Sequence, residues 1–263
     1  MKICLVQTAV QDGNVSNNIA AAKELAFSQD AELYLFPELF SIGSPIEDAS
    51  RFAEDEKGAT ISFLYELSRS KKAYSIGSYI EKEGSSLYKT AVVFDNNSKL
   101  ICKYRQIHLC SITGETQFFA AGSQMPYFDT FTFRSTNLLS YDLRFPEAAR
   151  EFGLSWGFFL FVQGAVKKDE SHQWLAFLQA RAAENQMYSF GTNRAGGDFA
   201  GKSAIFDPDG KEILITPEKE GAYLAEIDPF RVEWFRLRKQ YLTDARKFAY
   251  SGTVKASELD PEA

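Results

Sequence analysis

The chain has 263 residues and a formal net charge of −6, and 45% of its residues are hydrophobic, including 23 Phe and 12 Tyr. A chain of this size can bury a large apolar core without disulfides or structural metals. Its acidic balance argues against binding to nucleic acid or to a membrane surface, since both partners favour a basic face.

Cysteine and histidine usage limits the metal and redox chemistry that we expect. The three cysteines, Cys4, Cys102 and Cys110, lack paired or metal-type spacing, and we expect buried thiols in a reducing compartment. With only two histidines, a His-rich metal site is not expected. The N-terminal apolar run is too short for a signal peptide, and no stretch approaches the length of a membrane span. We therefore expect a cytoplasmic protein.

The first part of the chain reads as an α/β unit. Residues 2–8 form a short apolar run typical of a buried strand, and residues 14–28 have apolar side chains at helical spacing. Residues 32–38 predict a second strand that ends at Glu38, because Pro37 cannot continue the hydrogen-bonded ladder. The order strand, helix, strand indicates an α/β fold.

The middle of the chain predicts a helix followed by three strands. The helix covers Ala59–Lys71 and the first strand covers Tyr74–Glu81. The next two strands, Tyr88–Asp95 and Leu100–Leu109, are joined by the turn residues 96–98, which is a hairpin signal.

The second half continues the alternation of strands and helices. Residues 135–136 read as a turn before an apolar strand, and the stretch from Pro229 is amphipathic and basic. Aromatic residues among basic ones can bind nucleic acid, but a helix that covers the core or a dimer seam fits the acidic chain better. Residues 251–263 are polar and we expect a disordered tail after a single domain at 1–250. The remaining strands are predicted at 128–133, 157–162, 187–192, 201–206 and 221–227, and the helices at 146–153 and 171–185.

One stretch in this half has the pattern of a catalytic elbow. Residues 140–147 read SYDLRFPE, between the apolar run 137–139 and a helix that opens with Pro146. Such a strand-to-helix elbow exposes one side chain, here Ser140, beside backbone N–H groups that can bind an oxyanion. The alternative from the local pattern alone is an ordinary strand–helix connection with a serine at its corner.

The octapeptide resembles the nucleophile segment of the nitrilase superfamily of carbon–nitrogen hydrolases, in the omega-amidase-like branch. In that family its first position is the catalytic Cys, and here it is Ser140. The run FPELF at 36–40 resembles the segment of the general base and identifies Glu38 with it. The loop at 114–122 resembles the one with an auxiliary glutamate, which is Glu115. Tyr141 and Arg144, in the same segment as Ser140, are the candidate substrate-binding residues; for Arg144 the alternative is that it only anchors the elbow.

The family's catalytic lysine stands two residues before His-Leu, and in the run KYRQIHL at 103–109 this position is Gln106. Side chains of a strand alternate between its faces, so Lys103 and Arg105 point away from Gln106 and cannot replace the missing lysine. Loss of one oxyanion donor typically costs about 100- to 1,000-fold in rate. Serine is also a weaker nucleophile than a thiolate.

Two interpretations of function follow. The first is a pseudoenzyme-like protein that keeps a pocket for a small amide or carboxylate but is impaired in hydrolysis, because its triad reads Glu38, Gln106 and Ser140. The second is an active amidase that converts short carboxylated amides to acid and ammonia, with Ser140 as nucleophile or as a substitution of a native Cys. The resemblance implies a four-layer α-β-β-α sandwich and a homodimer or larger homo-oligomer, and it implies no cofactor and no metal. From the acidic balance we expect neither nucleic acid nor membrane as a partner.

Overall fold

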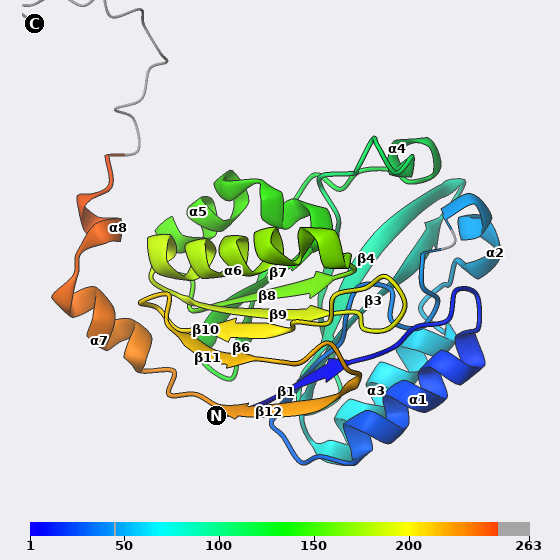
Figure 1. Ribbon diagram of the computed structural model, residues 1–263, viewed down its shortest axis with the longest axis horizontal. Coiled ribbons are helices and arrows are strands. Elements are labelled where there is room, and N and C mark those ends of the chain that lie inside the picture. The colour runs from blue at the N-terminus through cyan, green and yellow to red at the C-terminus, as the bar shows by residue number, and fades with distance from the viewer. Residues whose placement is uncertain (45, 247–263) are drawn as a thin grey trace, which may run out of the picture.

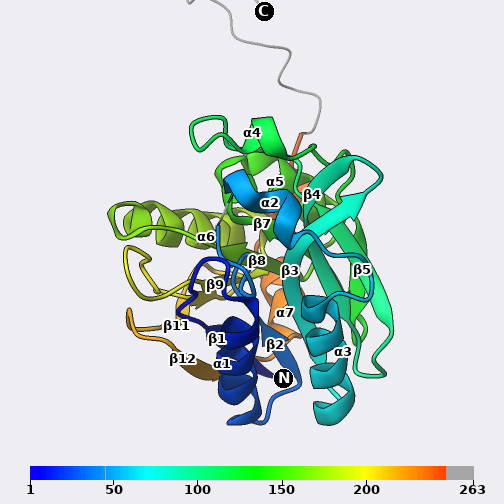
Figure 2. The same cartoon turned by 90° about the vertical axis from the view of Figure 1, so that its right-hand side faces the viewer.

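Two six-stranded mixed sheets pack face to face in the computed structural model, which describes residues 1–44 and 46–246. Helices α1 (Val15–Phe27) and α3 (Ala59–Lys71) cover the outer face of one sheet, and α5 (Pro146–Leu154) and α6 (Ser171–Asn185) cover the other (Figure 1). The view turned by 90° shows α1 and α3 side by side on their sheet (Figure 2). This is the four-layer α-β-β-α sandwich that the family resemblance implied.

The first sheet has the strand order β12-β1-β2-β3-β4-β5. Its strands β1 to β3 are mutually parallel, and β12, β4 and β5 are antiparallel to their neighbours. Its strands are β1 (Lys2–Gln7), β2 (Leu33–Leu35), β3 (Tyr74–Glu83), β4 (Ser86–Phe94), β5 (Leu100–Arg105) and β12 (Gly221–Glu226).

The second sheet repeats this arrangement, in the order β11-β10-β9-β8-β7-β6. Strands β7, β8 and β9 are parallel at its centre, and the outer strands pair antiparallel. Its strands are β6 (Tyr127–Thr130), β7 (Phe133–Leu139), β8 (Phe159–Gly164), β9 (Tyr188–Asn193), β10 (Ala204–Phe206) and β11 (Glu212–Ile215).

Alternation along the central strands explains why both faces of each sheet are buried. On β1, Ile3 and Leu5 pack in the apolar layer between the two sheets, whereas Cys4 and Val6 pack under α1 and α3. A strand covered on both faces reads as a continuous apolar run, which is how residues 2–8 appear in the sequence. Burial on both sides fixes the strand register, because a shift by one residue would exchange the two sets of side chains.

The prediction of a turn at Ser135–Thr136 is wrong. Both residues lie within β7, and the turn lies earlier, at Phe131, which has φ +58°. The two hydroxyl groups have partners in the β6–β7 hairpin: Ser135 Oγ donates to Thr130 Oγ1 at 2.8 Å, and Thr136 Oγ1 donates to the Pro126 carbonyl at 2.7 Å. Polar residues that are hydrogen-bonded in this way can occupy a buried strand, although their composition is typical of a turn.

Four predicted strands are shorter than expected. The strand predicted at 32–38 is limited to β2 and the one at 201–206 to β10, while the one at 128–133 ends at Thr130 and the one at 100–109 at Arg105. After Arg105 the backbone still bonds to β4 once, from Gln106 N–H to the Lys89 carbonyl at 2.9 Å, before it leaves the sheet. The short elements that the sequence did not predict are β11, α2 (Ala49–Phe52), α4 (Glu115–Phe118), and 3₁₀ turns at Ile46–Asp48, Ser140–Arg144 and Lys168–Glu170.

The basic stretch after Pro229 forms α7 (Arg231–Arg238) and α8 (Tyr241–Asp244). Val232 is fully buried and belongs to the apolar layer between the sheets, so α7 covers the core, as one of the two interpretations expected. The predicted polar tail at 251–263 lies outside the described residues. Among residues 1–44 and 46–246, no helix combines the length and the apolar character needed to cross a membrane.

Candidate active site

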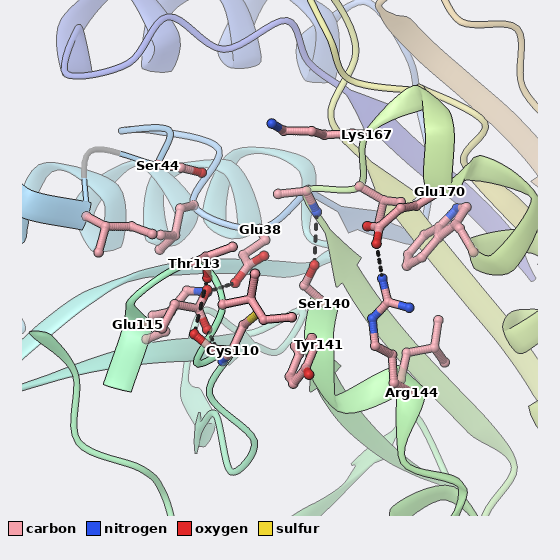
Figure 3. Close-up of a pocket in the computed structure, with 18 of the residues that line it drawn as sticks. Glu38, Ser44, Cys110, Thr113, Glu115, Ser140, Tyr141, Arg144, Lys167 and Glu170 are labelled. Carbon is pink, nitrogen blue, oxygen red and sulfur yellow. Dashed lines mark hydrogen bonds and ion pairs between the residues drawn. The ribbon is translucent and has the colours of Figure 1, made fainter. Parts of the chain in front are cut away.

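A pocket of about 490 Å³ lies where segments that follow strands of both sheets meet. Glu38 follows β2, and its N–H donates to the carbonyl of Gly164, the last residue of β8, at 3.2 Å. Figure 3 shows Glu38 and Glu115 on one side of the pocket, Arg144 with Glu170 on the other, and Ser140 between them. Apolar side chains contribute the remaining walls: Leu39, Ile46, Ile80, Phe119, Leu143, Val166, Trp174, Phe177 and Phe199.

Ser140 is the first residue of the 3₁₀ turn between β7 and α5, so the predicted strand–turn–helix elbow is present. Its φ is +25°, a region that residues other than glycine rarely adopt. Such strained backbone at a pocket is a feature of sites in which one side chain must be displayed. The Ser140 hydroxyl accepts a hydrogen bond from the N–H of Ala165 at 3.3 Å, and both residues line the pocket.

The fully buried carboxylate of Asp142 anchors the elbow through hydrogen bonds. It accepts hydrogen bonds from the Tyr104 hydroxyl at 2.7 Å, the His108 N–H at 2.9 Å and the Leu139 N–H at 3.2 Å. The His108 ring also lies 2.9 Å from this carboxylate and stacks on Phe145. The elbow of the second sheet is thus tied to the segment that follows β5 of the first sheet.

The two glutamates enclose a lysine that the sequence analysis did not consider. Lys89 Nζ lies 2.5 Å from Glu38 Oε1 and 2.6 Å from Glu115 Oε1, and all three side chains are almost fully buried. The other Glu115 oxygen accepts the Cys110 N–H at 2.8 Å, which holds the loop before α4 against the pocket. Lys89 also lines the pocket, together with Ser140.

Burial and charge shift the pKa values of this cluster. Burial raises the pKa of Glu38, with a further increase from the negative charge of Glu115, while Lys89 and the Ser140 hydroxyl lower it; the net shift is upward. Burial alone would lower the pKa of Lys89, but the two carboxylates outweigh this effect and raise it. Lys89 therefore keeps its positive charge, and Glu38 is a stronger base than an exposed glutamate.

The expectation that this site lacks a cation is wrong, although its argument about Lys103 and Arg105 is correct. Those two side chains bind Glu81, with Lys103 Nζ 2.5 Å and Arg105 Nε 2.8 Å from its carboxylate oxygens. The missed residue is Lys89, on β4. The predicted hairpin contained the signal, because pairing its two strands would have placed Lys89 beside Gln106.

Gln106 does not line the pocket formed by the described residues. Its amide nitrogen donates to the Leu139 carbonyl at 3.4 Å, and its amide oxygen is buried without a partner among the described residues. Of the six predicted site residues, the structure thus places Glu38, Glu115, Ser140, Tyr141 and Arg144 on the pocket wall and Gln106 behind the elbow strand.

Arg144 lines the pocket but already has protein partners. One guanidinium nitrogen lies 2.8 Å from Glu170 Oε1, and another donates to Gln173 Oε1 at 2.6 Å. The guanidinium also faces the Tyr141 ring, 5.7 Å from its centroid. The exposed Lys167 also lines the pocket, but its side chain extends toward the side of Ser44 and Glu38 (Figure 3). This wall therefore offers positive charge to a ligand, partly neutralised by Glu170.

The cysteines divide into two kinds. Cys4 and Cys102 are buried free thiols, and burial raises the pKa of each to about 12, so neither is reactive near neutral pH. Cys110 is partly exposed and lines the pocket, which corrects the expectation that all three are buried. Among the described residues, no group of three or more His, Cys, Asp or Glu side chains has the geometry of a metal site.

The pocket between the two sheets thus combines buried carboxylates, an ammonium group and a strained elbow. Residues 3–236 match the family described as carbon-nitrogen hydrolase. The chain belongs to this family, within the nitrilase superfamily.

Relatives and solved structures agree with this assignment. The chain is 29% identical to the 2-oxoglutaramate amidase of Bacillus subtilis, over 86% of this chain and 90% of that protein. Nit3 of Saccharomyces cerevisiae, a member of branch 10 of the nitrilase superfamily, superposes with a TM-score of 0.86 at 26% identity, over 94% of this chain and 97% of that one. XC1258 of Xanthomonas campestris has the same fold, with a TM-score of 0.89 at 23% identity and coverage of 94% and 98%.

Proposed function

We propose that this amidase-like protein binds a small amide, or the corresponding carboxylate, in the Ser140 pocket and is impaired in hydrolysis compared with a thiol enzyme. The observation that carries the proposal is the hydroxyl of Ser140, in place of a thiol, at the elbow beside Glu38. The pocket around it contains the Glu38 and Glu115 carboxylates and the Lys89 ammonium group, all buried in its wall.

The chemistry explains why a hydroxyl limits this site. In the reaction, the Ser140 oxygen would bond to the amide carbon while its proton moves to Glu38, leaving a negative charge on the former carbonyl oxygen. Collapse would break the carbon–nitrogen bond, with the proton returned from Glu38 to the departing ammonia, and water would then cleave the ester in the same way. A thiol ionises near neutral pH and starts this sequence readily, whereas a serine hydroxyl depends on a strong base. A carboxylate remains a weak base for it, even with a raised pKa.

The walls of the pocket indicate the class of ligand. Its volume of about 490 Å³ is suited to a small molecule, and its apolar side chains would pack against a short carbon chain. Arg144 supplies positive charge at the wall opposite Glu38 and Glu115, and Lys167 lies above Ser140 (Figure 3). We therefore infer a ligand with an amide or acid group near Ser140 and a second carboxylate toward Arg144, which must compete with Glu170 for the guanidinium.

An active serine amidase is the second candidate. It is favoured by one observation, that the Ser140 hydroxyl interacts with a Glu38 carboxylate whose pKa is raised, while Lys89 contributes a buried positive charge. A base, a nucleophile and a charge stabiliser are thus present together. This arrangement could release ammonia if Glu38 accepts the serine proton often enough.

Ammonia release and ligand binding distinguish the two candidates. Unmodified protein, Ser140→Cys and Ser140→Ala are compared by calorimetry and by ammonia release on short amides with and without a second carboxylate. We expect all three to bind, the unmodified protein to release no more ammonia than Ser140→Ala, and Ser140→Cys to gain about 100-fold or more, because a thiolate is available near neutral pH. Turnover by the unmodified protein that is lost in Ser140→Ala would establish the second candidate instead. Failure of all three proteins to bind would overturn the proposed ligand class.

Two further proposals concern the whole protein. We infer a cytoplasmic location, supported by the free thiols of Cys4, Cys102 and Cys110. We also propose a homodimer, supported by the exposed apolar residues of α7.

A further inference from the structure

We propose that Lys89, on β4, is the cation of the reacting site. It takes the place of the family's lysine, whose position in this chain is occupied by Gln106 on the neighbouring segment. The inference rests on the proposed function only in taking the Ser140 pocket as the reacting site. It changes the chemical description of this chain, because the site keeps its positive charge and lacks only the thiol.

The register of the β4–β5 hairpin explains why a lysine at position 89 can serve the same site as a lysine at position 106. Strand β4 pairs antiparallel with β5 through Ala91 with Tyr104 and Thr90 with Arg105. The next rung of the same register is Lys89 with Gln106, and Gln106 N–H donates to the Lys89 carbonyl at 2.9 Å. Residues directly opposite in an antiparallel pair point to the same face, with their Cβ atoms about 5 Å apart. A lysine has four side-chain carbons, so either position allows its ammonium group to reach the same region.

The residue pairs next to Lys89 and Gln106 show that these two residues lie on the face of the hairpin toward the elbow. Ala91 and Tyr104 are opposite one another and pack in the same apolar cluster, next to the elbow residues Leu139 and Leu143. Alternation places Lys89 on the face of Ala91, and the pocket lies at that end of the strand. Thr90, Lys103 and Arg105 lie on the other face, where they bind Glu81.

The contacts of Lys89 keep a charged ammonium group buried in the pocket wall. Its side chain is 5% exposed, and its ammonium group lies within 2.6 Å of a carboxylate oxygen of both Glu38 and Glu115. A buried lysine is stable only where such partners offset its desolvation. Because Lys89 lines the pocket with Ser140, its charge can stabilise an oxyanion that forms on a bound amide, or a thiolate at the elbow.

An exchange of positions tests the inference through activity. In the Ser140→Cys background, Lys89→Asn is expected to lower ammonia release by about 100- to 1,000-fold, the usual effect of losing one oxyanion stabiliser. Adding Gln106→Lys to Lys89→Asn should restore most of the rate, since the charge returns from the opposite strand. Gln106→Lys alone should change little, because the site already holds its cation. A large gain from Gln106→Lys alone, with no loss from Lys89→Asn, would overturn the inference.

A measurement without substrate tests the same point. The pH dependence of iodoacetamide alkylation reports the pKa of the thiol introduced by Ser140→Cys, with peptide mapping by mass spectrometry to separate it from Cys110. Removing Lys89 should move the midpoint upward by about 1–3 pH units, because a nearby positive charge stabilises the thiolate. The Lys89→Asn/Gln106→Lys exchange should move it back. An unchanged midpoint in Lys89→Asn would overturn the inference even if the ligand proposal holds.

Two matched variants make this result interpretable. Lys23→Asn removes the same charge from an exposed ion pair with Glu66 and should leave the midpoint unchanged. Lys89→Asn leaves two buried carboxylates without their cation and can unfold for that reason. Lys89→Asn/Glu115→Gln keeps the net charge of the cluster, so no extra buried carboxylate is left without a cation. It is compared with Glu115→Gln, from which it differs by Lys89 alone, and its midpoint should lie higher. If the two midpoints coincide, the effect of Lys89 is structural and the inference fails.

Discussion

Glu38 and Glu115 share one ammonium group, and this arrangement determines how the site responds to pH. Glu38 can accept a proton from Ser140 only in its ionised form. Because burial and the charge of Glu115 raise its pKa above the ordinary value of 4.5, the site should lose activity on acidification earlier than a site with an exposed glutamate.

Glu115→Gln should shift this acidic limb to lower pH. The substitution removes a negative charge beside Glu38 and leaves Lys89 with Glu38 as its single carboxylate partner, and both effects lower the pKa of Glu38. The measurement is the pH profile of ammonia release in the Ser140→Cys variant. Glu66→Gln, at an exposed ion pair, is the control and should leave the profile in place. A shift of the limb to higher pH would mean that Glu38 is not the group that titrates.

At the scale of single residues, short sequence motifs were sufficient to predict some site residues and insufficient to predict others. Glu38, Glu115 and Ser140 each lie in a short stretch that resembles a segment of the family; these stretches are weak singly and specific in combination, and the pocket brings the three residues together. Lys89 could not be found in this way, because nothing in its own strand distinguishes it from a surface lysine. Its role depends on its position opposite Gln106, and this position can be recognised only when the two strands are paired.

At the scale of elements, the elbow depends on Asp142. The φ of +25° at Ser140 is unfavourable and must be maintained by the surroundings, and the three hydrogen bonds to the buried Asp142 carboxylate are the contacts that do so. These bonds connect the end of β7 with the segment after β5. The nucleophile position is therefore fixed by both sheets together.

Asp142→Asn should destabilise the fold and weaken the site together. The amide retains one acceptor oxygen but presents N–H to groups that are themselves donors, and hydrogen bonds to a charged acceptor contribute about 1.5–3 kcal/mol each. We expect the free energy of unfolding to fall by about 2–4 kcal/mol, as measured by urea denaturation. Tyr104→Phe removes one of the three donors and should cost less. The prediction fails if Asp142→Asn is as stable as the unmodified protein.

The β6–β7 hairpin shows why element boundaries were harder to predict than their existence. Ser135 and Thr136 have the composition of a turn, and only the hydrogen bonds to Thr130 and Pro126 make them acceptable in a buried strand. Those partners belong to the neighbouring strand, so a reading of one segment at a time does not include them. The elbow was predicted because its signals, an apolar run and a proline at the first helical turn, are local.

At the scale of the whole molecule, the sandwich follows from strands that are apolar on both faces. Such strands require cover on each side, and a chain in which they alternate with amphipathic helices can provide it from the other sheet and from the helices. The α/β class was therefore predictable from these patterns, and the four-layer sandwich was expected from the family resemblance. The order of strands within each sheet was not, because the pairing of β1 with β12 joins the two ends of the domain.

The surface that remains uncovered supports the proposed homodimer. On and beside α7, Phe230 is 63% exposed, Trp234 51% and Leu237 80%. The following helix α8 contacts α6, so these residues lie at the end of the sandwich next to the α5–α6 layer (Figure 1). Several large apolar side chains in one exposed region are typical of a protein interface.

Leu237→Asp should convert a dimer to a monomer. A leucine buried in an interface contributes about 1.5–3 kcal/mol per subunit, and a carboxylate in its place would have to be desolvated without a partner. The measurement is the molar mass of the full chain by light scattering after size exclusion, at micromolar concentration. Tyr65→Asp on α3, where the residue is 43% exposed, is the matched control on the other helical layer and should remain dimeric. Dissociation by Tyr65→Asp and not by Leu237→Asp would place the interface on the α1–α3 layer, and a monomeric unmodified protein would exclude the homodimer.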